Sequence, residues 1–211
     1  MTLTELLHGM VPQAVAPLAV RGLAAHSKQV NPGDLFVAVR GPQHDGHAFL
    51  SEAVQRGACA IVVERPPVQM LPVPVFVVPD SRQVLIAIAS RFYGQPASRL
   101  RLVGVTGTCG KTTTAYLLKA ILEEASGKPV GLLGTVAYQI GTRRMPSTNT
   151  TPGPLELQRL LAQMVERDLT WCVMEVSSHA LDQGRIDGLR YDAAVFTNLG
   201  SDHLDYHGTR Q

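Results

Sequence analysis

A glycine-rich segment that holds one lysine and a run of threonines, residues 103–114, carries the clearest chemical signal in the chain. It reads VGVTGTCGKTTT, and an apolar pattern with helical spacing begins directly after it. Glycines such as Gly107 and Gly110 let backbone N–H groups approach phosphate oxygens, and a helix N-terminus attracts negative charge. The segment therefore predicts a nucleoside triphosphate site, with Lys111 reaching the outer phosphates.

This loop departs from the strict Walker pattern, which has a glycine six residues before the lysine, where this chain has Val105. The hydroxyl of Thr112 or Thr113 is the candidate magnesium ligand. An ordinary glycine-rich turn is the alternative interpretation. The lysine, the threonines and the flanking strand and helix agree with one another, so we favour the phosphate loop.

Further polar residues follow two later apolar runs that read as strands. Glu175 comes after residues 170–174 and is followed by Ser177, Ser178 and His179. Ligands bind at the carboxyl ends of strands in open α/β sheets, and nucleotide enzymes hold magnesium there. A helix-capping or salt-bridged glutamate is the alternative. The strand predicted at residues 193–196 leads into a second polar cluster, at 197–208, whose two acids and two histidines suggest metal or phosphate chemistry.

Composition excludes several classes of protein. The three cysteines are widely spaced and form no CxxC pair, which favours a reducing compartment over a disulfide framework or a zinc site. The net charge of +2 without a basic block gives no sign of nucleic-acid binding. Glu5, Pro12 and Pro17 interrupt the apolar N-terminal residues, and no run could span a bilayer. We expect a cytoplasmic protein without a signal peptide or membrane insertion.

Strand and helix patterns alternate along the chain, which predicts an α/β fold. Strands are expected at 20–25, 35–39, 60–63, 73–78, 102–105, 130–135, 170–174 and 193–196, with a hairpin around Gly141-Thr142. Helices are expected at 2–7, 48–57, 81–93, 115–122 and 155–167. Residues 94–98 interrupt the pattern, so we predict two domains, 1–94 and 98–211.

Taken together, these segments resemble the Mur ligases. The resemblance is carried by residues 107–113, 174–181 and 202–208, and residues 149–152 and 27–38 fit the same pattern. More narrowly, the chain is similar to the branch that adds the third peptide residue to UDP-N-acetylmuramoyl-L-alanyl-D-glutamate. The resemblance implies a small N-terminal α/β UDP-binding domain. A P-loop-type parallel-sheet ATP-binding domain, incomplete in this chain, would follow it.

The implied activity is an ATP-dependent amide ligase of peptidoglycan precursor synthesis, with ATP and Mg²⁺ as cofactors. ATP would phosphorylate the D-glutamate carboxylate, and the amine of meso-diaminopimelate or L-lysine would displace the phosphate. Carboxylate oxygen is a poor leaving group, so phosphorylation activates it. The enzyme must then neutralise phosphate charge and align an in-line transfer.

The resemblance also assigns residues to roles. ATP would be bound by Gly107, Thr108, Cys109, Gly110, Lys111, Thr112 and Thr113. Catalytic roles fall on Lys111, Glu175 and His203, and metal binding falls on Thr112, Glu175 and His203. The muramoyl dipeptide would contact Asn149, Thr150, Thr151, Ser177, Gln183 and Arg185, where an arginine suits a carboxylate or phosphate. The uridine diphosphate end would lie at Ser27, Gln43 and His44.

Among the departures from the family pattern, two bear most on the expected activity. Cys109 stands where the family usually has asparagine, which removes one amide from the loop. The family's carbamylated lysine should follow shortly after Gly208, and its amino-acid-binding C-terminal domain comes later still, whereas this sequence stops at Gln211. We therefore expect a fragment with little or no ligase activity alone, without the motif that separates diaminopimelate from lysine enzymes.

Three other functions fit part of the pattern. A folylpolyglutamate-synthase-like ligase shares the loop and the acyl-phosphate chemistry, but it lacks a uridine-binding domain such as the one expected at residues 1–94. A P-loop switch or kinase would hydrolyse or transfer phosphate without forming amides. A non-catalytic nucleotide-binding protein is the third. Turnover of ATP separates the second from the third, and dependence on a carboxylate acceptor separates both from a ligase.

Overall fold

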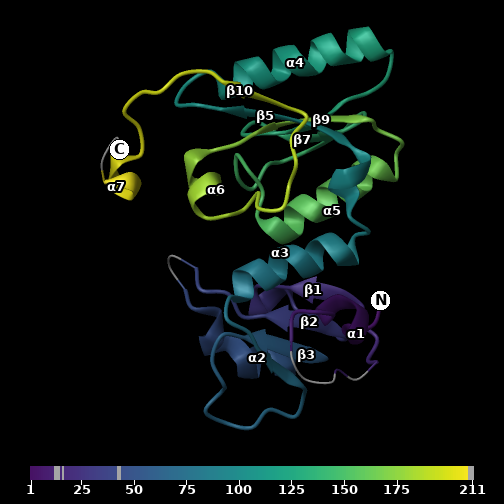
Figure 1. Ribbon diagram of the computed structural model, residues 1–211, viewed down its shortest axis with the longest axis vertical. Helices are drawn as coiled ribbons and strands as arrows, with labels where there is room; N and C mark the ends of the chain where they lie inside the picture. The colour runs from purple at the N-terminus through teal and green to yellow at the C-terminus, as the bar shows by residue number, and fades with distance from the viewer. Residues whose placement is uncertain (12–14, 16, 42–43, 209–211) are drawn as a thin grey trace. The chain divides into compact units, whose positions relative to one another are not determined.

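The structure is a computed structural model that describes residues 1–11, 15, 17–41 and 44–208 (Figure 1). The chain forms two compact units, Met1–Gly94 and Gln95–Gln211. The division falls within one residue of Gly94, where the glycine- and proline-containing segment begins. Each unit has its own parallel sheet and its own apolar clusters.

The first unit is built on a four-stranded parallel sheet in the order β1-β2-β3-β4. Its strands are β1 (Gly22–Ala24), β2 (Asp34–Val37), β3 (Ala60–Val63) and β4 (Val75–Val77). Its helices are α1 (Leu3–Leu7), α2 (Leu50–Gln55) and α3 (Ser81–Phe92), with 3-10 turns at η1 (Ser27–Gln29) and η2 (Gly46–Phe49). Because strand residues alternate between faces, Leu35 and Val37 pack in the cluster with α1 and α3, whereas Phe36 packs in the cluster with α2.

The helix starts of this unit follow the capping rules. Thr2 and Glu5 form a reciprocal capping box at α1. Asp80 accepts hydrogen bonds from the N–H groups of Arg82 and Gln83 at the start of α3. The helix predicted at residues 48–57 is shorter than expected, because the chain first makes the 3-10 turn η2.

The second unit contains a six-stranded sheet in the order β10-β5-β9-β6-β7-β8. The first four strands in that order are parallel, and β7 and β8 form an antiparallel hairpin, as predicted. The strands are β5 (Arg101–Thr106), β6 (Gly131–Leu133), β7 (Tyr138–Ile140), β8 (Arg143–Met145), β9 (Trp171–Glu175) and β10 (Ala193–Phe196). The helices are α4 (Lys111–Ser126), α5 (Pro154–Val165), α6 (Ser178–Asp182) and α7 (Leu204–His207), with a 3-10 turn at η3 (Pro96–Arg99).

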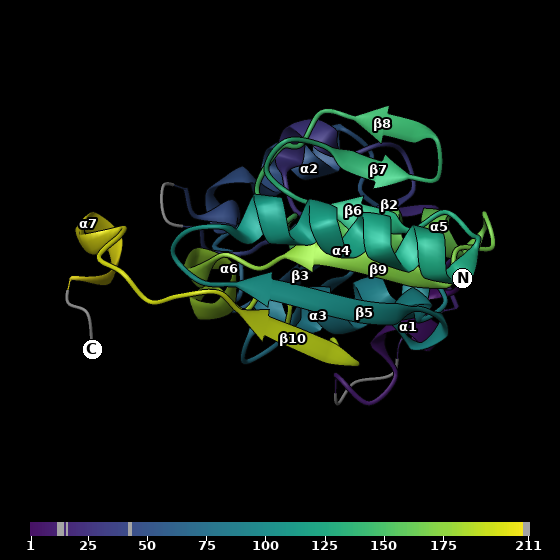
Figure 2. The same ribbon diagram turned by 90° about the horizontal axis from the view of Figure 1, so that it is seen from above.

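Helices α4 and α5 cover opposite faces of this sheet (Figures 1 and 2). The alternation of strand residues accounts for the two layers: Val103 and Val105 of β5 pack in the cluster with α4, and Leu102 packs in the cluster with α5. The central strands β5, β9 and β6 are therefore buried on both sides, as strands of parallel sheets usually are, whereas the edge strand β10 is mostly exposed. The α/β fold with parallel sheets that the sequence predicts is confirmed.

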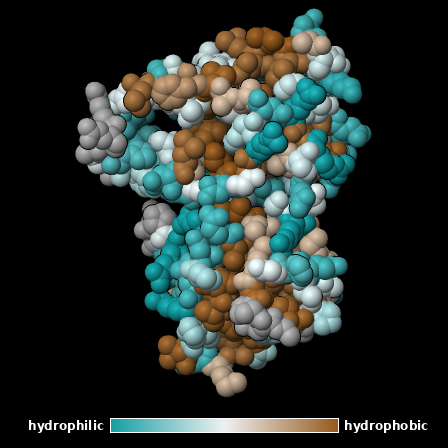
Figure 3. Space-filling view, viewed as in Figure 1, coloured by the Kyte–Doolittle hydropathy of each residue, from teal (hydrophilic) through white to brown (hydrophobic). Residues whose placement is uncertain are grey.

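The outward face of α4 is unusually apolar. Leu117 and Ile121 are 60% and 61% exposed, and Figure 3 shows apolar surface where this helix lies. They are four residues apart and so lie on the same side of the helix. Among the residues that the structure describes, no helix is both long and apolar enough to cross a bilayer.

Candidate functional site

The predicted site residues of the second unit gather where its parallel strands end. Strands β10, β5, β9 and β6 are neighbours and run in the same direction, so their carboxyl ends meet at one edge of the sheet. The loops that follow these strands carry the phosphate loop, Glu175 and Ser177, and two segments that begin at Gly134 and Thr197. Such an edge is where open α/β sheets bind ligands.

The phosphate loop ends in a helix N-terminus that suits an anion. Gly110 has φ 86° and precedes Lys111, the first residue of the 16-residue helix α4, and no side chain caps this end. The N–H groups of a helix's first turn have no acceptor within the helix. A Cβ at Gly110 would meet nothing within 4 Å, so the space beside the loop is open. The arrangement fits a phosphate group.

The Lys111 side chain folds back over its own loop. Its Nζ donates hydrogen bonds to the carbonyl oxygens of Gly107, at 2.7 Å, and Thr108, at 3.0 Å. These contacts hold a half-buried ammonium group beside the loop, where its charge complements an anion.

Asn198 belongs to the polar cluster predicted at 197–208, and it has a role there that sequence reasoning did not identify: it fixes the shape of the loop. Its backbone carbonyl accepts the N–H of Thr108, and its side-chain amide pairs with both the N–H and the C=O of Cys109. The Thr197 hydroxyl also donates to the Cys109 carbonyl, at 2.7 Å. A Cβ at Gly107 would overlap the Thr197 hydroxyl, which explains the glycine there. Because Asn198 engages two of the loop amides, those of residues 110–113 are better placed for phosphate.

Glu175 is fully buried at the end of β9, and three donors surround its carboxylate. The Thr112 hydroxyl donates to it at 2.9 Å, and Thr135 donates both its N–H and its hydroxyl at 3.0 Å. A Cβ at Gly134 would overlap Glu175 Oε1, so only glycine leaves room for the carboxylate. Gly134 and Thr135 therefore form a cradle for Glu175 that sequence reasoning did not identify.

The surroundings of Glu175 fit a hard divalent cation. Buried carboxylates are normally paired with a base or bound to a metal, and no ion pair joins Glu175 to a basic side chain in the described part of the chain. The neighbouring side-chain oxygens belong to Thr112, Thr135 and Thr150, and oxygen is the ligand that Mg²⁺ prefers. Among described residues no three His, Cys, Asp or Glu side chains form a metal cluster. Magnesium often uses only one or two carboxylates beside phosphate oxygens.

The predicted dipeptide contacts Thr150, Thr151 and Ser177 lie next to this carboxylate. The Thr150 hydroxyl is 3.0 Å from that of Thr135. Thr151 is fully buried, where its hydroxyl donates to the Glu175 carbonyl and accepts the Ser177 N–H. Both functions of the Thr151 hydroxyl thus go to the backbone, which leaves Thr150 as the accessible hydroxyl. The Asn149 backbone is held by the Tyr138 hydroxyl, through its N–H and its C=O.

Gln183 and Arg185 form a connected pair beside the same loop. Gln183 Oε1 accepts hydrogen bonds from Arg185 Nε, at 2.9 Å, and Nη2, at 2.6 Å. Arg185 Nη1 donates to the Thr151 carbonyl at 3.1 Å. The guanidinium group therefore has a defined orientation next to the hydroxyl-rich loop.

His203 lies in the wall of a cavity of about 650 Å³ that Lys111, Gly107, Ser177 and Asp182 also line. Its backbone is left-handed, with φ 52°, and its ring lies 4.6 Å from that of His179. In the described part of the chain, no hydrogen bond or ion pair connects His203 with Thr112 or Glu175. The structure thus brings together two of the three predicted metal ligands, Thr112 and Glu175, and places His203 in a cavity wall that neither of them lines.

In the first unit, the predicted uridine contacts have different surroundings. Ser27 is buried, and its hydroxyl donates to Glu52 at 2.8 Å. This hydrogen bond lowers the pKa of the Glu52 carboxyl. His44 is exposed, with its ring 6.5 Å from that of Phe49, and Gln43 lies outside the described residues.

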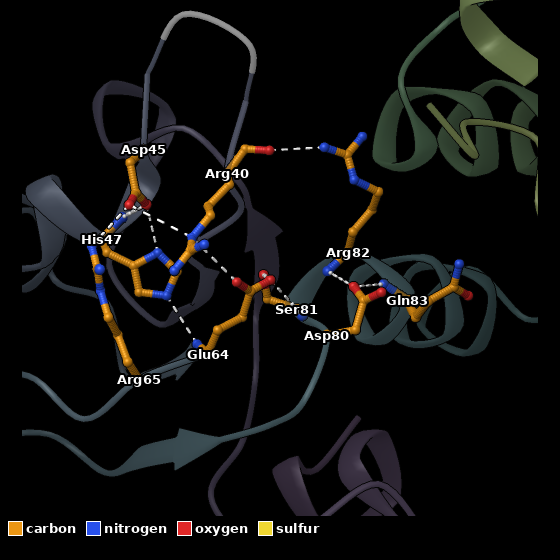
Figure 4. A network of polar contacts seen from close by, with 9 residues as sticks. All are labelled: Arg40, Asp45, His47, Glu64, Arg65, Asp80, Ser81, Arg82 and Gln83. Carbon is orange, nitrogen blue, oxygen red and sulfur yellow. Dashed lines mark hydrogen bonds and ion pairs between the residues drawn. The ribbon is translucent and has the colours of Figure 1, made fainter. Parts of the chain in front are cut away.

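A polar network supports the segment that carries His44 (Figure 4). His47 Nε2 accepts the N–H of Glu64, which leaves the proton on Nδ1 for the 2.6 Å contact with Asp45. Asp45 also accepts from Arg65 at 2.9 Å, and its pKa is lowered mainly by the His47 N–H. The network ties the segment after β2 to the end of β3, at the carboxyl edge of this sheet.

Comparison with known proteins agrees with this architecture. The Mur ligase middle domain matches residues 105–211, more than half of the chain, and the Mur ligase family catalytic domain matches residues 19–93. The chain belongs to the Mur ligase family. Its matched region includes the phosphate loop, Glu175 and His203.

Several curated relatives of this Mur ligase chain share one name, UDP-N-acetylmuramoyl-L-alanyl-D-glutamate--2,6-diaminopimelate ligase. That of Geobacillus thermodenitrificans (strain NG80-2) is 54% identical over 189 residues, which is 90% of this chain and 38% of the relative. That of Aquifex aeolicus (strain VF5) is 46% identical over 192 residues, which is 91% of this chain and 39% of the relative. The chain thus spans about two fifths of the length of these relatives.

Solved structures of Mur ligases share the fold. A structure described as UDP-N-acetylmuramoyl-L-alanyl-D-glutamate--2,6-diaminopimelate ligase matches with a TM-score of 0.82 and 31% identity, over 99% of this chain and 42% of that one. A MurF ligase from Thermotoga maritima in complex with ADP matches with a TM-score of 0.58 and 30% identity, over 93% of this chain and 42% of that one. Both comparisons extend across both units of the chain.

Proposed function

We propose that this chain is the nucleotide-binding and UDP-muramoyl-binding part of an ATP-dependent, ADP-forming ligase. The full-length protein would add meso-diaminopimelate, or L-lysine, to the D-glutamate of UDP-N-acetylmuramoyl-L-alanyl-D-glutamate, here called the UDP-muramoyl dipeptide. One observation carries the proposal: Thr112 of the phosphate loop bonds to the buried Glu175, next to Thr150 and Ser177. The names of the curated relatives favour diaminopimelate as the amine. With ATP as its cofactor, the proposed full-length enzyme would act in the cytoplasm.

For the nucleotide, the proposal assigns phosphate binding to the amides of residues 110–113 and to the ammonium group of Lys111. Lys111 would exchange its two carbonyl contacts for phosphate oxygens, which form stronger, charge-assisted hydrogen bonds. Thr112 and Glu175 would hold Mg²⁺, and His203, in the wall of the cavity that Lys111 also lines, is the candidate for a second ion. Bound Mg²⁺ would neutralise phosphate charge.

For the muramoyl dipeptide, the proposal assigns Arg185 to a carboxylate or phosphate group and Thr150 to a polar group of the peptide. The D-glutamate carboxylate would take the γ-phosphoryl group from ATP, which releases ADP and gives an acyl phosphate. The amine nitrogen would then attack the acyl carbon, expel inorganic phosphate and lose a proton. In this reaction, the chain's own contribution is to align the two reactants.

The other functions fit less well. A folylpolyglutamate-synthase-like ligase does not account for residues 19–93, which match the Mur ligase family. A P-loop switch or kinase does not account for the hydroxyl-rich loop at 147–151 or for the Gln183–Arg185 pair beside it. A binding protein without catalysis remains distinguishable by experiment.

The proposal is tested by calorimetric titration of the chain with ATP and Mg²⁺ and, separately, with the UDP-muramoyl dipeptide. We expect both to bind. Lys111→Ala should weaken ATP binding, while Lys119→Ala, which removes a lysine paired with Glu123 farther along α4, should not. Arg185→Ala should weaken dipeptide binding, while Arg159→Ala, at an exposed arginine on α5, should not.

Each result has a defined meaning. Binding of ATP alone would reduce the assignment to a nucleotide-binding domain. Binding of neither ligand by a folded chain, as judged by circular dichroism, would contradict the proposal.

A further inference from the structure

A hydroxyl group on the segment after His203 contacts the end of α6 and the proposed substrate residue that directly follows this helix. Tyr206 of α7 donates its O–H to Asp182 Oδ2 at 2.7 Å. The oxygen of the Tyr206 hydroxyl also accepts a hydrogen bond from Gln183 Nε2 at 3.2 Å. Asp182 is the last residue of α6, and Gln183 follows it directly, so one phenol spans two adjacent side chains.

The chemistry of these groups fixes the direction of each hydrogen bond. An ionised carboxylate only accepts, so Tyr206 must donate to Asp182. The lone pairs of the phenol oxygen then face Gln183, which must present its NH₂ group. With the NH₂ group turned toward Tyr206, the carbonyl oxygen of the Gln183 amide faces the other way.

The series of hydrogen bonds that begins at Asp182 ends at the guanidinium group of Arg185. Arginine only donates, and both Nε and Nη2 bond to Gln183 Oε1. A flipped Gln183 amide would set its NH₂ group against these two donors. Asp182 can only accept a hydrogen bond, and Arg185 can only donate. Only one orientation of the Gln183 amide between them therefore satisfies both ends of the series.

Arg185 connects this series of hydrogen bonds to the loop beside Glu175, because its Nη1 donates to the Thr151 carbonyl. Gln183 thus restrains one edge of the guanidinium group, and Thr151 restrains another. A fixed guanidinium group loses less conformational entropy when it binds a carboxylate or a phosphate.

We propose that Tyr206 is a positioning residue, which orients the Gln183 amide and, through it, the Arg185 guanidinium group for the acidic substrate. This inference rests on the proposed function, because it takes Arg185 as a contact of the UDP-muramoyl dipeptide. It adds that the segment 204–207, which directly follows the predicted metal residue His203, completes the substrate subsite.

The test is the affinity of the UDP-muramoyl dipeptide for the Tyr206→Phe chain, measured by titration calorimetry. Phenylalanine keeps the ring, which lies 4.2 Å from that of His179, and removes only the hydroxyl. We expect binding to weaken about three- to tenfold, the usual effect of losing one hydrogen bond. The affinity for ATP should stay unchanged, which separates positioning from general damage to the unit.

Tyr116→Phe is the matched control. The Tyr116 hydroxyl also accepts a hydrogen bond from a glutamine amide, that of Gln139, at 3.1 Å. In the part of the chain that the structure describes, no hydrogen bond joins Tyr116 or Gln139 to Gln183 or Arg185, so this variant should bind the dipeptide as the unsubstituted chain does.

A double-substitution cycle with Gln183→Met tests the route of the effect. If Tyr206 acts through the Gln183 amide, Tyr206→Phe should weaken binding no further once that amide is gone. Full affinity in Tyr206→Phe, or additive losses in the cycle, would overturn the inference while the proposed function stood. Failure of the unsubstituted chain to bind the dipeptide would overturn the proposed function, and the inference with it.

Discussion

The hydroxyl of Thr112 donates a 2.9 Å hydrogen bond to the Glu175 carboxylate, 63 residues further along the chain. The sheet explains how the two residues meet. Strands β5 and β9 are parallel neighbours in which Val105 pairs with Glu175, so the loop after β5 begins beside that carboxylate. Adjacent parallel strands thus deliver a hydroxyl and a carboxylate to one point, as a site for a phosphate-bound cation requires.

This contact predicts how Thr112 variants respond to Mg²⁺. Thr112→Val keeps the shape of the side chain and removes its oxygen, so ATP affinity in the presence of Mg²⁺ should fall by at least about tenfold. Thr112→Ser retains the oxygen and should bind nearly as well as the unsubstituted chain. Titrations of each variant with ATP, in the presence of Mg²⁺ and in the presence of EDTA, measure whether the loss of affinity depends on the metal. An equal loss in EDTA would show that the hydroxyl acts on the loop rather than on the metal.

Gly134 predicts a second effect on the same carboxylate. An alanine Cβ at this position would overlap Glu175 Oε1, and the carboxylate would have to leave the cradle formed by Thr135. Gly134→Ala should therefore reduce Mg²⁺-dependent ATP binding and destabilise the unit by about 1–3 kcal/mol. Chemical denaturation and ATP titration measure the two effects.

Gly153→Ala serves as the control for Gly134→Ala. A Cβ at Gly153 would meet nothing within 4 Å, and its φ of −66° suits alanine. This variant should keep its ATP affinity. If both variants lost Mg²⁺-dependent binding equally, the overlap with Glu175 would not be the cause.

Local sequence patterns predicted the parts of this site that depend on short-range structure. The phosphate loop and Glu175 follow directly from apolar runs that end in turns, and the observed strands β5 and β9 each end one residue beyond the predicted ranges 102–105 and 170–174. The roles of Thr135 and Asn198 could not be found in this way, although Asn198 stands in the polar cluster predicted at 197–208. The two residues follow β6 and β10, and only the strand order β10-β5-β9-β6 places those strand ends beside the loop.

Burial was equally invisible to the sequence patterns. Ser27 and Thr151 stand in polar, turn-rich segments that predict accessible hydroxyls, yet both are buried and bonded to partners within the chain. Helices α6 and α7 were missed because five and four residues are too short for a periodic pattern. The start of α6 did have a signal in the sequence, because serine is a favoured helix-capping residue. In the structure the Ser177 hydroxyl caps this helix by accepting the Ala180 N–H.

The network around Asp45 predicts a pH-dependent contribution to stability. The His47 N–H lowers the pKa of Asp45 from 3.8, so the ionised carboxylate stabilises the folded state above that pH. The contribution should disappear as the pH falls below 3.8 and through the lower pKa of the folded state. Asp45→Asn should therefore cost about 0.5–1 kcal/mol at pH 7, since the group is partly exposed, and less at pH 3, where the unfolded chain is largely protonated.

Urea denaturation at both pH values measures this difference. Asp80→Asn is the control in the same network, because asparagine caps helices as well as aspartate does and Asp80 accepts only backbone N–H groups there. It should change stability little at either pH. An Asp45→Asn penalty as large at pH 3 as at pH 7 would show that the carboxylate charge is not its source.

Cys109 predicts a chemical footprint of nucleotide binding. Of the three cysteines it is the exposed one, in the middle of the phosphate loop. Burial raises the pKa of the Cys59 thiol and raises that of Cys172 to about 12, so these two should react slowly with iodoacetamide near neutral pH. Cys109 should be alkylated first. Bound ATP should slow its alkylation by covering the loop, as peptide mass spectrometry over time would show.

The variant Cys109→Asn, which restores the residue usual in the family, controls for the identity of the reactive site. It should lose the fast alkylation and still bind ATP, because Asn198 holds residue 109 through its backbone N–H and C=O, which any side chain leaves in place. Adenosine, which lacks phosphates, should protect Cys109 much less than ATP does. Equal protection by adenosine would place the nucleoside, rather than the phosphates, over the loop and would contradict the assignment of residues 107–113 as the phosphate site.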